Sequence, residues 1–139
     1  MNVRGIITGL TRGSNRNHIV RAALESIAYQ VADLLDAIFQ DMNINLSILK
    51  VDGGACVNNF LMQFQADMIQ QTIDRPVNIE STALGAGMLS GLVTGFWSNS
   101  GELINMRKTE SIFTPKISAI ERLALVKSWK TAIKQAKLI

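Results

Sequence analysis

The sequence predicts an α/β domain built on a parallel or mixed sheet. Apolar residues recur every three or four positions over residues 16–42, which is the pattern of a helix with one buried face. A β-branched and leucine-rich run at 46–51 ends in the glycine turn 52–54, and helical spacing resumes at Asn58. Strand, glycine turn and helix in this order are typical of α/β sheets, and 139 residues suit one domain with one core.

The composition is that of a folded domain. Hydrophobic residues make up 47% of the chain and charged residues 18%, so a core can be filled and disorder is not expected. The apolar stretches stop well short of the roughly 18 residues of a membrane span, and the N-terminus lacks the layout of a secretory signal. We therefore expect a cytoplasmic protein with no membrane partner. The single cysteine, Cys56, excludes an internal disulfide and a multi-cysteine metal site.

The net charge of +3 is carried in part by lysines on one side of the last predicted helix. No arginine-rich or aromatic platform accompanies them, so they are interpreted as a solvated helix face, and we expect no nucleic-acid partner. These residues are Lys127, Lys130, Lys134 and Lys137.

The first predicted element is a short strand at 3–9, where two isoleucines lie among glycines. The long helix that follows begins at Asn15 or Arg16 and ends where residues 43–45 break the apolar pattern. Its expected buried face consists of Ile19, Ala23, Ile27, Val31, Leu34, Leu35 and Ile38.

The middle of the chain continues the alternation of strand and helix. After the strand at 46–51, a second helix is predicted over 58–70 because apolar residues keep helical spacing there. Proline cannot continue a helix, so Arg75-Pro76 is interpreted as the opening of a short strand at 77–79. The next helix covers about 81–91. Its glycines at 87 and 91 leave one side almost without side chains, so we expect something to pack closely there.

The last third of the chain is predicted to be a connection followed by a docked helix. Residues 96–115 form a mixed connection with a short helix capped by Asn99 and Glu102. Ser118 and Glu121 have the spacing of a capping box, which opens an amphipathic helix over 118–137. The expected buried face of that helix consists of Ile120, Leu123, Val126, Trp129 and Ile133.

Gly53, Gly54 and Asn58 are the candidate binding residues. Glycine has no Cβ, so the backbone can approach a ligand closely, and the first N–H groups of the following helix favour a phosphate or a polar ring edge. This pattern points to an ATP site. A tight strand-to-helix turn with no ligand would use the same residues, and the spacing alone leaves both interpretations open.

His18, Tyr29 and Trp97 are weaker candidates. His18 stands beside the start of the long helix with no nucleophile or acid near it in sequence, so a capping or packing role is expected. Tyr29 and Trp97 could stack on a purine, but one lies inside a buried helix and the other at the end of a helix. We expect core packing for both.

Four segments resemble the glycerol kinases of the FGGY carbohydrate kinase family, and the similarity extends from Arg4 to about Ala136. The most specific are Val-Asp-Gly-Gly-Ala at 51–55 and Asn-Asn-Phe-Leu-Met-Gln-Phe-Gln-Ala-Asp at 58–67, because other sugar kinases of the family differ within that block. The remaining two segments are 5–13 and 17–30, which together resemble the family's C-terminal signature.

The resemblance implies an actin-like ATPase (ribonuclease H-like) fold, in which two domains close over ATP and the substrate. Residues 1–139 would be the C-terminal ATP-binding domain, truncated at its N-terminal side so that its first two strands are missing. Gly54 matches the family's backbone contact to ADP, and Asn58 matches a side chain near the adenosine. Gly53 stands beside them, and Asp52 would either orient the turn or cap the helix.

The resemblance also implies an activity, the transfer of the γ-phosphoryl group of ATP to glycerol with Mg²⁺ as the metal of the intact enzyme. The phosphate-binding hairpin, the glycerol pocket and the catalytic aspartate lie upstream in the family, so we assign no catalytic residue and no metal ligand here and expect the isolated chain to be inactive. A kinase of another polyol or sugar, and a non-catalytic module that binds a partner through the helix at 118–137, are the alternatives.

Two structural expectations follow from the resemblance. In the family's strand order 3-2-1-4-5, the strand near Ile6 would not neighbour the strand near Leu49 without the missing pair, so the sheet would be split. Exposed edges recruit strands, so we expect either an unpaired edge on each piece or completion of the sheet by a second copy of the chain, which would make a homo-oligomer. Residues 82–87 match an interdomain helix with alanine at position 87 in most of the family. Gly87 should loosen that helix by roughly 0.5–1 kcal/mol.

Overall fold

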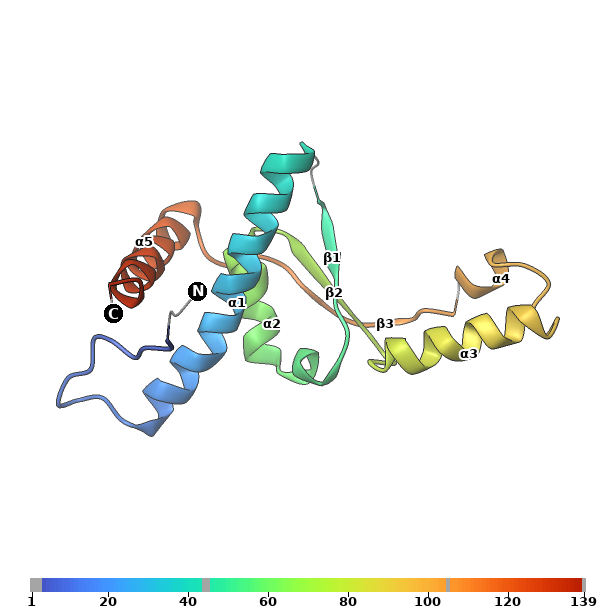
Figure 1. The fold of residues 1–139 in the computed structure, drawn as a ribbon, viewed down its shortest axis with the longest axis horizontal. Helices are drawn as coiled ribbons and strands as arrows, with labels where there is room; N and C mark the ends of the chain where they lie inside the picture. The colour runs from blue at the N-terminus through green and yellow to red at the C-terminus, as the bar shows by residue number, and fades with distance from the viewer. Residues whose placement is uncertain (1–3, 44–45, 105, 139) are drawn as a thin grey trace.

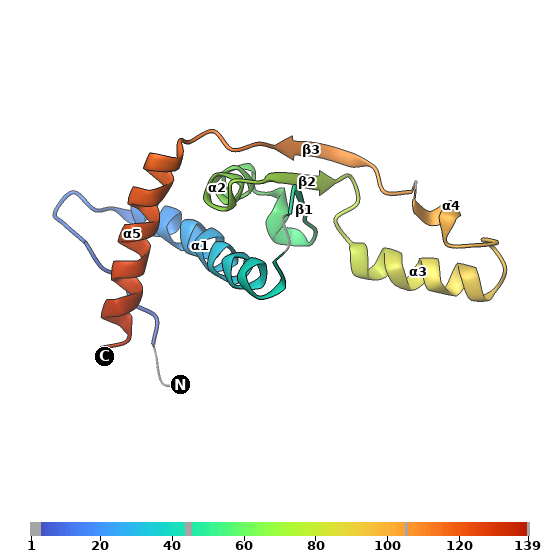
Figure 2. The same cartoon turned by 90° about the horizontal axis from the view of Figure 1, so that it is seen from above.

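The computed structural model describes residues 4–43, 46–104 and 106–138. Figures 1 and 2 show α1, α2 and α5 at one end of the molecule, α3 and α4 at the other, and a small sheet between them. No helix of these described residues combines the length and apolar character needed to cross a membrane. In chain order the elements are α1 (Arg16–Met42), β1 (Ile48–Lys50), the 3₁₀ helix η1 (Gly54–Val57), α2 (Asn59–Ile69), β2 (Thr72–Pro76), α3 (Ser81–Val93), α4 (Gly101–Ile104), β3 (Thr109–Phe113) and α5 (Ala119–Ala136).

The helix α1 begins at a capping box. The Asn15 side-chain oxygen accepts hydrogen bonds from the backbone N–H groups of Asn17 and His18, and His18 Nδ1 accepts one from the backbone N–H of Asn15 at 3.2 Å. The capping role expected for His18 is therefore confirmed. The helix ends at Met42 and is followed by its C-cap, Asn43, which takes the left-handed conformation with φ 49°. Residues 44–45 of the predicted break lie outside the described residues.

The sheet has the order β1-β2-β3 and is mixed, as predicted. β1 runs parallel to β2, whereas β3 runs antiparallel to it. The predicted strand at 77–79 is wrong, because β2 lies at Thr72–Pro76 and Pro76 closes it at a register irregularity. Proline has no N–H to give to the ladder, and a sheet tolerates it at an irregularity such as this one.

The connection predicted over 96–115 contains one expected element and one that was missed. The short helix is present as α4, and the caps are confirmed because Asn99 Oδ1 accepts from the N–H of Gly101 and Glu102 accepts from the N–H of Ser98. β3 was not predicted. Its sequence Thr-Glu-Ser-Ile-Phe has little alternation, and it forms because it completes the second edge of β2.

The strand predicted at 3–9 is not formed in residues 4–9, and Val3 lies outside the described residues. Extended backbone becomes a strand only when a neighbour pairs with its N–H and C=O groups, and β1 and β3 flank β2 in the sheet. The segment lies instead by the last helix, where the Thr8 hydroxyl donates to Gln135 Oε1 at 3.0 Å.

The core is built where α1, α2 and α5 meet the sheet. Tyr29 of α1 packs edge-to-face on Phe64 of α2 with ring centroids 5.4 Å apart, and stacks on Trp129 of α5 at 5.1 Å. Core packing of Tyr29 is thus confirmed. Burial and the nearby Glu25 carboxylate raise the pKa of Tyr29 to about 12. The other buried core residues include Ala28, Ala32, Cys56, Leu61, Met62, Ala66, Met68, Ile69 and Ile73.

The buried face of α1 differs from the predicted one. Its buried residues are Ala28, Tyr29 and Ala32, whereas Ile27 is exposed and Leu34 is 61% exposed. Leu35 of the predicted face is partly buried and packs against the core. Apolar side chains occur on more than one side of this helix, so the spacing of apolar residues does not determine which side packs against α2. The two alanines lie on the buried side, and small side chains let helix backbones approach closely.

The helix α5 begins at the predicted capping box of Ser118 and Glu121. Its predicted face is only partly right: Val126 and Trp129 pack against the core, but Ile120 is 81% exposed and Leu123 is exposed as well. Arg122 lies toward the core instead, with its Nε donating to the carbonyl of Met68. The four lysines assigned to the outer side are exposed.

The helix α3 has no buried residue among its thirteen. A Cβ added to Gly91 would collide with the ring of Trp97, so Trp97 covers this part of the bare side. The core packing expected for Trp97 is wrong, because the half-buried ring lies against α3 and outside the core cluster of the described residues. A Cβ at Gly87 would meet nothing within 4 Å, so the close neighbour expected there is absent from the described residues. The apolar surface includes Val93, which is 88% exposed.

Candidate functional site

The glycine turn lies between β1 and α2 and is held by the backbone. Gly53 has φ 80° and ψ 169°, a conformation that is open to glycine alone for practical purposes. Its N–H donates to the carbonyl of Ile79 at 2.8 Å, and its carbonyl accepts from the N–H of Cys56 at 3.1 Å, which starts η1. The chain thus reverses at Gly53 because only a residue without Cβ can turn there.

Open space lies beside the two glycines. A Cβ built on Gly53 or Gly54 would meet no heavy atom within 4 Å, and Gly54 is exposed. A ligand can therefore reach the backbone of this turn without a side chain in its way. The sequence predicted close approach here, and the geometry is compatible with it.

Asn58 connects the turn to α2. It is half-buried and is the N-cap of α2, because its side-chain oxygen accepts from the N–H of Leu61 at 3.0 Å. Its carboxamide NH₂ group is then the part suited to a ligand. The helix is capped by Asn58 and η1 has no side-chain cap, so the capping role considered for Asp52 is wrong.

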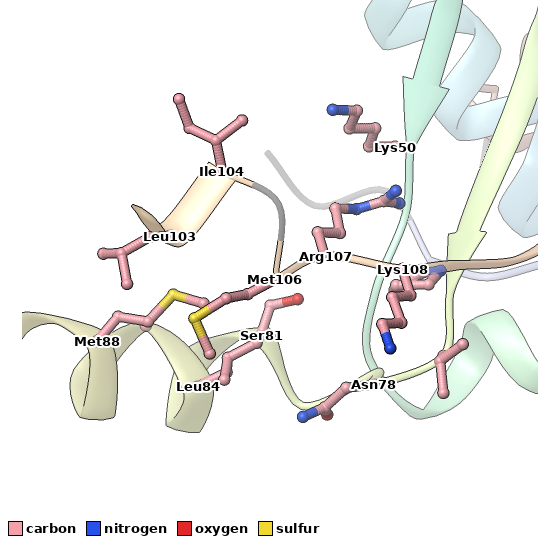
Figure 3. Close-up of a pocket in the computed structure, with 13 residues that line it drawn as sticks. Lys50, Asn78, Ser81, Leu84, Met88, Leu103, Ile104, Met106, Arg107 and Lys108 are labelled. Carbon is pink, nitrogen blue, oxygen red and sulfur yellow. The ribbon is translucent and has the colours of Figure 1, made fainter. Parts of the chain in front are cut away.

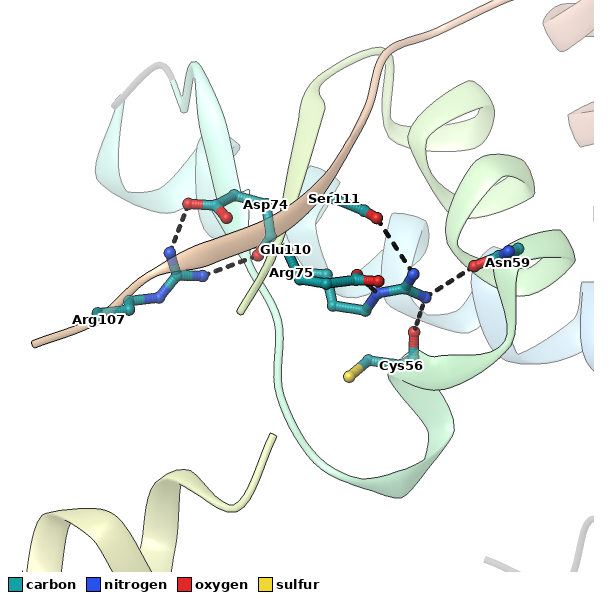
Figure 4. Close-up of polar contacts among 7 residues, drawn as sticks. All are labelled: Cys56, Asn59, Asp74, Arg75, Arg107, Glu110 and Ser111. Atoms are coloured by element: carbon teal, nitrogen blue, oxygen red, sulfur yellow. Dashed lines mark hydrogen bonds and ion pairs between the residues drawn. The ribbon is translucent and has the colours of Figure 1, made fainter. Parts of the chain in front are cut away.

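Arg75 of β2 holds the far end of η1, and sequence reasoning missed it. Its Nη1 donates to the carbonyl of Cys56 at 2.9 Å and to Asn59 Oδ1 at 2.8 Å, as Figure 4 shows. Its Nε pairs with Glu110 at 2.6 Å. The hydrogen bond from Arg75 holds the pKa of Glu110 below its ordinary value. The sequence placed Arg75 before a short strand at 77–79 and gave no signal that its side chain reaches η1.

A second ion pair involves the preceding residue of β2, the buried Asp74, and the half-buried Arg107. Arg107 donates to Asp74 Oδ2 at 2.6 Å and to the Asp74 carbonyl at 2.9 Å (Figure 4). Burial acts to raise the pKa of Asp74, but the hydrogen bond from Arg107, together with Thr109 and Lys50, outweighs it and lowers the pKa. Burial likewise raises the pKa of the Cys56 thiol, so it is not a reactive thiolate.

A cavity of about 520 Å³ lies between the sheet and the α3–α4 end of the molecule (Figure 3). It combines cationic and apolar side chains, but Gly53, Gly54 and Asn58 do not line it. The cavity and the glycine turn are therefore separate features of this chain. Its lining includes Lys50, Asn78, Leu84, Met88, Met106, Arg107 and Lys108.

Within residues 4–43, 46–104 and 106–138, no three His, Cys, Asp or Glu side chains are grouped so that they could hold a metal ion. We therefore assign no described residue to Mg²⁺.

Comparisons with known proteins identify the family of the chain. A model of the C-terminal domain of the FGGY family of carbohydrate kinases matches residues 1–93. The chain belongs to this family. Curated relatives in the FGGY family include the glycerol kinase of Petrotoga mobilis, 52% identical over 137 residues, and that of Aeromonas salmonicida, 53% identical over 134 residues. These alignments cover 99% and 96% of this chain but only 28% and 27% of the relatives, so the chain spans little more than a quarter of their length.

Solved structures of FGGY kinases have the same fold. The Plasmodium falciparum glycerol kinase with ADP superposes on 97% of this chain with a TM-score of 0.86 and 34% identity, and 27% of that protein is covered. A xylulose kinase from Lactobacillus acidophilus gives a TM-score of 0.71 over 91% of the chain, with 25% of that protein covered. At 21% identity the second match shows the fold alone. The expectation of an α/β, actin-like ATPase fold is confirmed, with the chain covering part of it.

Proposed function

We propose that this chain is the C-terminal ATP-binding part of a glycerol kinase, an enzyme that transfers the γ-phosphoryl group of ATP to glycerol and forms glycerol 3-phosphate. The observation that carries the proposal is identity of 52–53% to named glycerol kinases over nearly the whole chain. The Plasmodium falciparum glycerol kinase was crystallised with ADP, which supports a nucleotide as the ligand of this fold.

In this proposal the Gly53-Gly54 turn forms one wall of the nucleotide site. The open space beside both glycines allows the nucleotide to contact backbone N–H and C=O groups directly. Asn58 uses its side-chain oxygen to cap α2 and would use its NH₂ group toward the adenosine. ATP supplies the phosphoryl group when bound, and these residues orient the nucleotide without taking a proton or attacking it.

The remaining parts of the proposal concern the whole enzyme. Residues 1–139 form a single domain piece, and Mg²⁺ accompanies the nucleotide through its phosphates, as phosphoryl transfer requires. Other parts of the enzyme, which this chain does not supply, bind the acceptor hydroxyl and carry the catalytic carboxylate. For the 139-residue chain by itself, we further propose a cytoplasmic homo-oligomer in which a second copy of the chain covers the edge of β1, with no nucleic acid or membrane as partner.

The experiment joins this chain to the upstream three quarters of the Petrotoga mobilis glycerol kinase, in place of that enzyme's own matching segment. Glycerol-dependent ADP release is then measured for the joined protein and for the 139-residue chain alone. The joined protein should turn over and the chain alone should not. A folded joined protein without activity contradicts the proposal, and turnover by the chain alone contradicts the division of labour proposed here.

The choice of glycerol over another polyol or sugar has a matched control. The same chain is joined to the upstream part of the Lactobacillus acidophilus xylulose kinase and assayed with xylulose. The two domains must fit each other when they close, and this chain is 52% identical to the Petrotoga mobilis glycerol kinase but 21% identical to the xylulose kinase. The chain should therefore fit the upstream part of the glycerol kinase far better. Activity in the xylulose kinase background equal to that in the glycerol kinase background would contradict the assignment.

A further inference from the structure

The side chain of Arg75 joins three elements that are separate in sequence. It lies on β2, is only 9% exposed, and reaches η1 and the first residue of α2 with one nitrogen, Nη1. The two acceptors on that side are the carbonyl of Cys56 and the side chain of Asn59. They flank Asn58, so the arginine holds the chain on both sides of a predicted nucleotide contact.

The same guanidinium is held on its other side by β3. Glu110 accepts from Nε at 2.6 Å, and the Ser111 hydroxyl accepts from Nη2 at 3.3 Å. The ring of Phe113 lies 5.1 Å from the guanidinium carbon, within the range of a cation–π contact. These contacts fix the plane of the guanidinium, and Figure 4 shows the resulting path from β3 through Arg75 to η1.

The glycine turn has few other attachments. Gly54, Ala55 and Val57 of η1 are exposed, and only Cys56 of that helix is buried. The bond from the Gly53 N–H to Ile79 anchors the start of the turn, whereas Arg75 anchors its end. A short 3₁₀ helix with one buried side chain needs such hydrogen bonds to stay in one conformation.

From these contacts we infer that Arg75 is a positioning residue, which sets the place of the Gly53-Gly54 turn and of Asn58 for the nucleotide. The inference rests on the proposed function for its ligand, but the contacts themselves do not depend on it. Lysine cannot replace arginine here, because one ammonium group lacks the planar fork that reaches η1 and β3 at once. A displacement of even 1 Å in such a turn can cost about 100-fold in rate.

The experiment compares Arg75→Lys and Arg75→Met with Arg107→Met. The control removes Arg107, a half-buried arginine just before β3, whose hydrogen bonds go to Asp74 and not to η1. Amide hydrogen exchange of the whole 139-residue chain is followed at 53–59 and at Tyr29 in the core. Loss of a charged hydrogen bond should speed exchange at 53–59 by about tenfold or more in both Arg75 variants, with Tyr29 unchanged. The control should leave exchange at 53–59 as it is.

A second readout uses the joined kinase described above. Arg75→Lys should raise the KM for ATP by about tenfold and leave the KM for glycerol unchanged, because the turn contacts only the nucleotide. Arg107→Met should lower thermal stability without this selective effect. Unchanged exchange at 53–59 in both Arg75 variants overturns the inference. So does an equal rise in both KM values. If the unmodified joined kinase is inactive, the proposed function fails, and exchange at 53–59 still decides the role of Arg75.

Discussion

Replacing Gly53 with alanine should destabilise the protein through the backbone alone. The residue has φ 80° and ψ 169°, a region that costs a residue with Cβ on the order of 1–3 kcal/mol. The added Cβ would meet no heavy atom within 4 Å, so no collision contributes to the loss. The hydrogen bond from the Gly53 N–H to Ile79 prevents the turn from relaxing without further cost. We therefore expect the free energy of unfolding to fall by about 1–3 kcal/mol.

The assay is urea unfolding followed by far-ultraviolet circular dichroism, with both the midpoint and the slope fitted. Gly54→Ala is the matched control, because Gly54 lies next to the same open space but does not have a left-handed φ. Its stability should stay constant or rise by about 0.4–1 kcal/mol. A Gly53→Ala variant as stable as the parent would refute the reasoning, as would an equal loss in both variants.

Three more predictions concern Asp74, Gly87 and the sheet edge. Because the pKa of Asp74 is lowered in the folded protein, its carboxylate stabilises the fold fully above the ordinary aspartate pKa of about 3.9, and this stabilisation is lost as the pH falls through the pKa of the folded state. The free energy of unfolding, measured as a function of pH, should show this loss. The loss should be smaller in Arg107→Met. Gly87→Ala should stabilise α3 by roughly 0.5–1 kcal/mol, because alanine favours a helix and its methyl group would meet no heavy atom within 4 Å. Amide hydrogen exchange in α3 measures this change, and faster exchange would contradict the prediction. The open edge of β1 should support self-association in light scattering. A monodisperse monomer with fully protected amides at 48–51 would count against it.

Local signals in the sequence predicted most helices well. α1 and α5 begin where Asn15 and Ser118 cap them, because a cap is a contact between residues three apart and needs no tertiary neighbour. The start of α2 near Asn58 was predicted from the apolar spacing, and the structure shows that Asn58 caps the helix there. The turn at Gly53 was also predicted, since a positive φ is a property of a single residue.

Strands and buried faces were predicted less well. β2 was placed after Pro76 instead of before it, and β3 was missed, because a strand exists only when a neighbour pairs with it. Of the α1 face that was expected inside, Leu35 packs against the core, but the fully buried residues are Ala28, Tyr29 and Ala32. Helical spacing shows that a helix has apolar faces, and packing against α2 selects one of them.

For the candidate site, the sequence by itself determined the glycine turn, its strand-to-helix setting and the resemblance to FGGY kinases, all of which depend on residues that are close in the chain. The nucleotide roles of Gly53, Gly54 and Asn58 stay predictions. Only the tertiary structure brought Arg75 to η1, across 19 residues to Cys56 and 35 to Glu110. A guanidinium makes such contacts only after β2, β3 and α2 have packed, so no spacing in the sequence could have placed it.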